Sequence, residues 1–192
     1  MKKIITITGP SGSGKSTTEL MLEELMGCYR LRSVTTRAKR EDDIPGAYKY
    51  ITQEEFDLID SRSGFKERAT FGKNSYGLEE EEIQRFLNSD KSVAVFVVEI
   101  NGLIEFKSKS LEQSDYSIYS TYLNISKECQ IERMIKRGNT QEFINSRITD
   151  DNISSEYEKN KNLFDMFLDN GNLKIEDTAM NIYMSMEGVS AC

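Results

Sequence analysis

The segment "GPSGSGKST", residues 9–17, has the residue types and spacing of a loop that holds phosphate groups. It fits the pattern G-x-x-x-x-G-K-[ST] through Gly9, Gly14, Lys15 and Ser16. In such a loop the backbone N–H groups turn toward phosphate oxygens, and the following helix adds the positive end of its dipole. Lys15 would bridge the terminal phosphates and Ser16 would bind Mg²⁺. We therefore predict a nucleotide site with ATP-binding residues Gly9, Ser11, Gly12, Ser13, Gly14, Lys15, Ser16 and Thr17.

The flanks of this segment decide between a phosphate loop and a glycine-rich turn that only starts a helix. An apolar run over residues 3–8 precedes it, and a helical pattern over 15–26 follows it. A strand before and a helix after are the context that the motif requires. The flanks favour the phosphate loop, which a GTPase, an ATPase motor or a small-molecule kinase could each contain.

A second set of polar groups lies in "SVTTRAKREDDIPGAYKY", residues 33–50. Arg37 and Arg40 stand three residues apart beside several hydroxyl side chains. Two guanidinium groups at this spacing can clamp one phosphate monoester, with Tyr48 as a further donor. A basic cluster of this kind is also compatible with a solvated surface.

Apolar stretches that alternate with helical patterns indicate how these groups are positioned. Strands are expected at residues 3–8, 93–99, 117–124 and 164–168. Helices are expected over 15–26, 127–137, 141–162 and 174–186, and another is expected to begin at Thr52, where "TQEEF" forms a capping box. This alternation predicts a parallel α/β sheet flanked by helices.

The stretch between residues 33 and 89 is polar and rich in glycine, unlike the apolar strands on either side. We interpret it as an insertion into a core made of 1–32 and 90–192. The length of 192 residues fits one domain that includes such an insertion.

Composition excludes several classes of function. A net charge of −7 argues against a general nucleic-acid binder, and no apolar run is long enough to span a membrane. The chain contains no histidine, which excludes a histidine general base, and its three cysteines are widely spaced. That spacing predicts neither a disulfide framework nor a zinc site and fits a reducing cytoplasm. The expected partners are small-molecule nucleotides.

From residue 4 to about residue 170 the chain resembles guanylate kinases, with the motifs in the same order. The matching segments are "GPSGSGKST", "SVTTRAKR", "FKERATFGKNSYG", "VVEING" and "IERMIKRGN". The resemblance implies a P-loop parallel sheet with an inserted nucleoside-monophosphate (NMP)-binding subdomain at 33–89 and a short lid at about 137–147.

The resemblance also implies roles for individual residues. The NMP phosphate would be held by Arg37, Arg40, Tyr48 and Tyr76, and the base would face Ser33, Glu67 and Glu99. Arg133 would contact ATP, and the catalytic set would be Lys15, Arg37, Arg137 and Arg147. A carboxylate such as Glu67 suits guanine because it accepts from both the ring N–H and the exocyclic amine. Read without the family, Glu67 is compatible with a surface acid, and Arg133 with Arg137 is compatible with a solvent-facing stripe.

Three positions depart from the family pattern. Leu78 follows "YG", where guanylate kinases usually have Ser or Thr. Val97 stands where an acid is frequent, and Glu99 replaces the usual Asp. An apolar residue in place of a hydroxyl removes one hydrogen bond to the base.

These observations together predict an ATP-dependent kinase that converts GMP or dGMP to the diphosphate, with Mg²⁺ as cofactor. One alternative is a kinase of the same fold acting on another nucleoside monophosphate or on a ribose bisphosphate. Another is a non-catalytic scaffold, which the intact phosphate loop disfavours.

Overall fold

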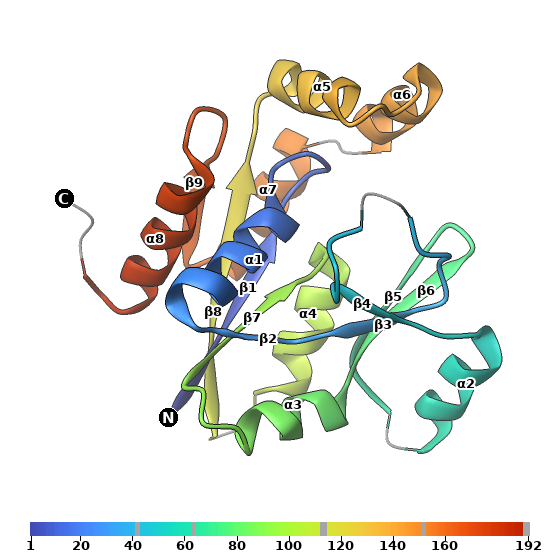
Figure 1. Ribbon diagram of the computed structural model, residues 1–192, viewed down its shortest axis with the longest axis vertical. Coiled ribbons are helices and arrows are strands. Elements are labelled where there is room, and N and C mark those ends of the chain that lie inside the picture. Colours follow the sequence, from blue (N-terminus) through green and yellow to red (C-terminus); the bar gives the residue numbers. More distant parts are fainter. Residues whose placement is uncertain (41–42, 63, 112–114, 151–152, 190–192) are drawn as a thin grey trace.

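The computed structural model describes residues 1–192 except 41–42, 63, 112–114, 151–152 and 190–192 (Figure 1). Its main sheet has five strands in the order β2-β7-β1-β8-β9, and every neighbouring pair is parallel. The strands are β1 (Lys2–Thr8), β2 (Tyr29–Arg30), β7 (Val93–Val97), β8 (Tyr116–Asn124) and β9 (Met166–Asp169). The predicted parallel α/β sheet is confirmed.

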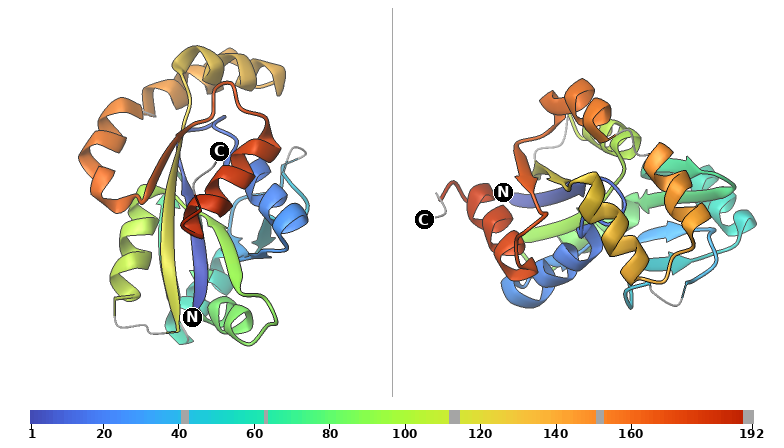
Figure 2. Two further views of the ribbon diagram at one scale, coloured as in Figure 1. Left: turned by 90° about the vertical axis from the view of Figure 1, so that its left-hand side faces the viewer. Right: turned by 90° about the horizontal axis from the view of Figure 1, so that it is seen from above.

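Alternation of side chains along the strands builds a separate core on each face of this sheet. Ile4 and Phe96 face one side, where α3 (Glu80–Leu87) and α4 (Ile100–Lys109) pack. Ile5 and Val95 face the other, where α1 (Lys15–Met26) and α8 (Ile175–Met186) pack. The two views of Figure 2 show helices on both sides of the sheet. The sheet is therefore the middle layer of three.

A second sheet of four strands, in the order β4-β3-β6-β5, forms within the predicted insertion. Its strands are β3 (Ser33–Thr35), β4 (Tyr48–Tyr50), β5 (Phe65–Phe71) and β6 (Asn74–Glu79). Helix α2 (Gln53–Arg62) covers it, and Val34, Phe56 and Phe65 form a small core of their own. The expected capping box is present, since Thr52 Oγ1 accepts from the Glu55 backbone at 3.2 Å and Glu55 Oε2 accepts from the Thr52 backbone at 2.8 Å. The bounds 33–89 stay a prediction.

Three helical regions differ from the sequence prediction, and one of them is α3, which was not among the expected helices. Helix α4 was not expected, because its Asn101-Gly102 pair is typical of a turn; burial of Leu103 and Phe106 against the sheet outweighs that local preference. The single helix expected over 141–162 is wrong: the described residues form α6 (Gln141–Asp150), α7 (Ile153–Asn160) and a 3₁₀ turn, Lys161–Leu163. The expected helix over 127–137 is α5 (Lys127–Lys136).

Two further sequence expectations concern cysteines and membrane spans. Cys28 and Cys129 are free thiols, whereas Cys192 lies outside the described residues. Among the helices of the described chain, none is long and apolar enough to cross a membrane.

Candidate functional site

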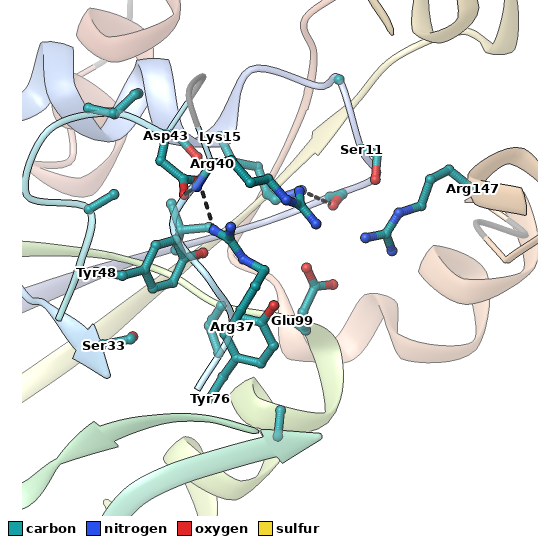
Figure 3. A pocket seen from close by; sticks show the side chains of 18 of the residues that line it. Ser11, Lys15, Ser33, Arg37, Arg40, Asp43, Tyr48, Tyr76, Glu99 and Arg147 are labelled. Atoms are coloured by element: carbon teal, nitrogen blue, oxygen red, sulfur yellow. Dashed lines mark hydrogen bonds and ion pairs between the residues drawn. The ribbon is translucent and has the colours of Figure 1, made fainter. Parts of the chain in front are cut away.

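A cavity of about 640 Å³ opens beyond the carboxyl ends of β1 and β7. Ligands of open parallel sheets bind at this edge. Most of the predicted site residues line the cavity, namely Gly9, Ser11, Gly12, Gly14, Lys15, Ser16, Thr17, Ser33, Arg37, Arg40, Tyr48, Glu67, Tyr76, Glu99, Arg137 and Arg147. The predicted donor loop and the predicted acceptor residues therefore share one cleft (Figure 3).

The phosphate loop needs its glycines for both conformation and space. Gly12 and Gly14 have φ of 80° and 96°, values that disfavour residues with a Cβ. A Cβ on Gly9 would overlap the carbonyl oxygen of Leu123. Gly14 is the N-cap of α1, so the loop passes directly into the helix N-terminus.

Lys15 lies folded across the mouth of the phosphate loop. Its Nζ donates to the carbonyl oxygens of Gly9 at 2.6 Å and Pro10 at 3.0 Å. An ammonium group held by two neutral carbonyls is available for phosphate oxygens, which are stronger acceptors.

Two predicted ATP residues do not line the cavity. Ser13 is fully buried behind the loop. Arg133 donates to the carbonyl oxygens of Gly12 at 3.2 Å, Asn170 at 2.8 Å and Gly171 at 3.1 Å. In this structure Arg133 therefore braces the loop from α5.

Asn170, which was not identified from the sequence, supports the same loop. Its side-chain Nδ2 donates to the Ser13 carbonyl oxygen at 2.7 Å, and its Oδ1 accepts from Thr178. Asn170 follows β9 directly. A polar residue at the carboxyl end of a predicted strand was the signal that could have identified it.

On the acceptor side, Arg37 is buried and paired with a residue that the sequence analysis also missed. Its Nη2 donates to Asp43 Oδ1 at 2.7 Å. The other Asp43 oxygen accepts from the Arg40 backbone and the Tyr50 hydroxyl, both at 2.7 Å. Burial alone would raise the pKa of Asp43, but hydrogen bonds from Arg37, Arg40 and Tyr50 lower it to about 2. The Asp43 carboxylate therefore occupies a position next to the cleft where three hydrogen-bond donors stabilise a negative charge.

Aromatic rings hold the cleft arginines in place. The Arg37 guanidinium lies 5.5 Å from the ring centroid of Tyr48, which in turn lies 6.0 Å from that of Tyr76. The guanidinium carbons of Arg40 and Arg147 lie 5.9 Å and 5.3 Å from the ring centroid of Phe143 in α6. Cationic side chains from the segment between β3 and β4 and from α6 therefore meet at one ring beside the cavity, which favours an anion between them.

Glu67 is 3% exposed, and its carboxylate fits closely against α4. A Cβ on Gly102 would lie 2.5 Å from Glu67 Oε2, so this position needs glycine. Burial and the charge of Glu105 raise the pKa of Glu67 to about 7, while a hydrogen bond from the Leu78 backbone opposes the shift.

The Leu78 side chain belongs to the main core and not to the cavity lining. It is fully buried with Ile83 and Phe106, while its backbone pairs with Glu67. The position that usually offers a hydroxyl in the family therefore presents only its backbone N–H to the neighbouring carboxylate.

A second buried carboxyl, Glu19 of α1, lies behind the phosphate loop. It is 5% exposed, and its Oε1 accepts from the Val97 backbone at 3.3 Å. Burial raises the pKa of Glu19 to about 8, and Arg30 opposes the shift.

Because of the raised pKa values of these two carboxyls, we predict that the free energy of unfolding of the ligand-free protein falls as pH rises from about 4.5 to about 8. The folded protein holds protons on Glu67 and Glu19 that the unfolded chain has released, so each group lowers the free energy of unfolding by at most about 1.4 kcal/mol per pH unit. Urea unfolding between pH 5 and 8 measures the slope. Glu19→Gln and Glu67→Gln should each flatten it, and profiles parallel to that of the wild type would contradict the prediction.

The chain matches known proteins along most of its length. The family model described as guanylate kinase matches residues 1–187. A guanylate kinase of Clostridium perfringens is 31% identical over 137 residues, 70% of this chain. That match covers 61% of the relative's length, so the chain spans less than two thirds of it.

Other relatives match over more of their length. The guanylate kinase of Prochlorococcus marinus is 30% identical over 189 residues, covering 94% of this chain and 95% of the relative. The crystal structure of guanylate kinase from Anaplasma phagocytophilum superposes with a TM-score of 0.67 at 21% identity, covering 97% of this chain and 85% of that one, and supports the fold. On the family model and these relatives, the chain belongs to the guanylate kinase family.

Proposed function

We propose that the protein transfers the terminal phosphoryl group of ATP to GMP or dGMP, which yields ADP and GDP or dGDP. The observation that carries this proposal is that Lys15 of the phosphate loop and Arg37, which lies between β3 and β4, line the same cavity. Phosphoryl transfer needs little beyond such positioning and the stabilisation of negative charge. A general base is therefore not required.

On the donor side, Lys15 would contact the terminal phosphates of ATP, with the backbone N–H groups of residues 9–17 around them. The chemistry of the site fits Mg²⁺, since Ser16 lines the cavity and carries a hydroxyl oxygen. Among the described residues no group of three or more acidic, histidine or cysteine side chains could hold a metal alone. Mg²⁺ is commonly bound by few protein ligands together with substrate phosphates, where it neutralises developing charge.

On the acceptor side, Arg37, Arg40, Tyr48 and Tyr76 would hold the phosphate of the monophosphate. Glu67, Ser33 and Glu99 would face the base. For Glu67 to accept from guanine it must be ionised, and two N–H donors favour that form.

Arg137 and Arg147 would close over the transferred group from a lid at about 137–147. Both line the cavity. Their arrival would exclude water and place positive charge beside the equatorial oxygens of the phosphoryl group.

The free thiols of Cys28 and Cys129 support the expected reducing cytoplasm.

An ADP-release assay with GMP, dGMP, AMP, dTMP, CMP, UMP and a ribose bisphosphate as acceptors tests this function. We expect turnover with GMP or dGMP and little with the others. High turnover confined to a non-guanine acceptor would contradict it. That result would instead support a kinase for another acceptor, which the burial of Leu78 away from the cavity favours as the second candidate.

Removal of the Glu67 charge should weaken selection of guanine. In Glu67→Gln the amide can accept only one of the two guanine N–H groups, so we expect kcat/KM for GMP to fall about 10²-fold or more. Glu81→Gln makes the same change in net charge at a side chain that is 62% exposed and serves as the control. Equal values for Glu67→Gln and the control would contradict the assignment.

A further inference from the structure

Glu19 is a buried carboxyl close to the proposed Mg²⁺ site that the roles above leave unused. It follows Ser16 by three residues on α1, so both side chains lie on the same side of the helix. Both residues line a small cavity of about 10 Å³, which is the volume of a single water. Ser33 and Tyr48 line it as well, so four polar side chains face it beside apolar ones.

The position of Glu19 relative to β7 gives this carboxyl its significance. Its Oε1 accepts from the backbone N–H of Val97 at 3.3 Å. Val97 is the strand-end residue where the family frequently has an acid, and valine provides no carboxylate there. In P-loop enzymes an acid at this edge of the sheet helps to hold Mg²⁺ beside the loop hydroxyl. In this chain a carboxyl group reaches the same edge from α1 instead of from the strand.

Its surroundings fix the Glu19 side chain in this place. It is 5% exposed, between α1 and β7. The positive charge of Arg30 favours the ionised form of Glu19, and the Arg30 Nε also contacts Glu23 Oε2 at 3.3 Å. A carboxylate that a backbone N–H and a charged neighbour both orient loses little entropy when it acts on a nearby group.

We propose that Glu19 is the positioning residue of the Mg²⁺·ATP site: it orients the Ser16 hydroxyl, in place of the acid absent at position 97. This inference rests on the proposed ATP and Mg²⁺ site and adds a residue to it. It concerns donor binding only and is independent of which monophosphate is the acceptor.

The test measures binding of a fluorescent ATP analogue, without acceptor, as Mg²⁺ is titrated and again with EDTA. For Glu19→Gln, which keeps the shape but cannot ionise when Mg²⁺ binds, we expect the Mg²⁺ concentration for half-maximal enhancement to rise about 10–100-fold. Affinity in EDTA should stay at the wild-type value. Glu23→Gln, one turn further along α1 and also near Arg30, is the matched control and should leave both unchanged.

Restoring an acid on the strand gives a second readout that a purely structural role would not produce. Glu19→Gln combined with Val97→Asp should recover part of the lost Mg²⁺ dependence. Glu19→Gln with unchanged Mg²⁺ dependence would overturn the inference, as would an equal loss of affinity with and without Mg²⁺. Wild-type protein that binds ATP with no Mg²⁺ enhancement would overturn the proposed Mg²⁺·ATP site, and this inference with it.

Discussion

Lys15→Ala is expected to lower kcat with ATP and GMP by about three or more powers of ten. The Lys15 ammonium lies at the mouth of the phosphate loop, where it donates to the carbonyl oxygens of Gly9 and Pro10. In the transition state it would balance charge that builds up between the two phosphates, and alanine leaves that charge unopposed. Steady-state ADP release at saturating substrates measures the loss.

Lys127→Ala, at an exposed lysine of α5, is the control for charge and should retain wild-type turnover. Circular dichroism should show the same fold for both variants, because Lys15 is not part of either core. Turnover within a few-fold of wild type in Lys15→Ala would contradict the mechanism.

Arg37→Ala is expected to lower kcat/KM for the monophosphate by about 10²–10⁴-fold, mainly through KM. Two charge-assisted hydrogen bonds to a phosphate contribute about 1.5–3 kcal/mol each. The variant also leaves the Asp43 carboxylate, now 2.7 Å from Arg37, without its guanidinium partner beside an incoming anion. Arg37→Lys should recover little, since an ammonium cannot make the same bidentate contact.

The double variant Arg37→Ala with Asp43→Ala separates these two effects. Removal of the unpaired carboxylate should return part of the affinity for GMP, while the affinity for ATP should match the wild type in every variant. Arg85→Ala, which removes an arginine paired with Glu81 and Glu82 on α3, is the matched control. An unchanged KM for GMP in Arg37→Ala would show that this guanidinium does not hold the acceptor.

The sequence predicted the parts of the fold that depend on local patterns. The apolar run before Gly9 and the loop glycines predicted β1, the turn and α1 within one residue. The capping box at Thr52 predicted the start of α2 for the same reason, since its hydrogen bonds join residues three apart. Helix α4 was missed because its stability comes from burial against the distant strands β1 and β7.

The site was predictable where motifs carry it and not where tertiary contacts do. Asp43 and Asn170 were missed because their significance comes from partners brought close by folding, Arg37 for the first and the Ser13 carbonyl for the second. Phe143 was missed because an isolated aromatic residue carries no motif, although Arg40 and Arg147 meet at its ring. The position of Arg133 against the loop likewise depends on the approach of α5 to β9.

The central claim is that donor and acceptor phosphates meet end to end in one cleft. Calorimetric titration with adenosine and guanosine joined through five phosphates tests this claim most directly, because the molecule spans both sites only if they are continuous. We predict one molecule bound per chain, at least about 100-fold more tightly than ATP or GMP alone, with affinity reduced by both Lys15→Ala and Arg37→Ala. Binding no tighter than that of ATP, with GMP still able to bind beside it, would contradict the account.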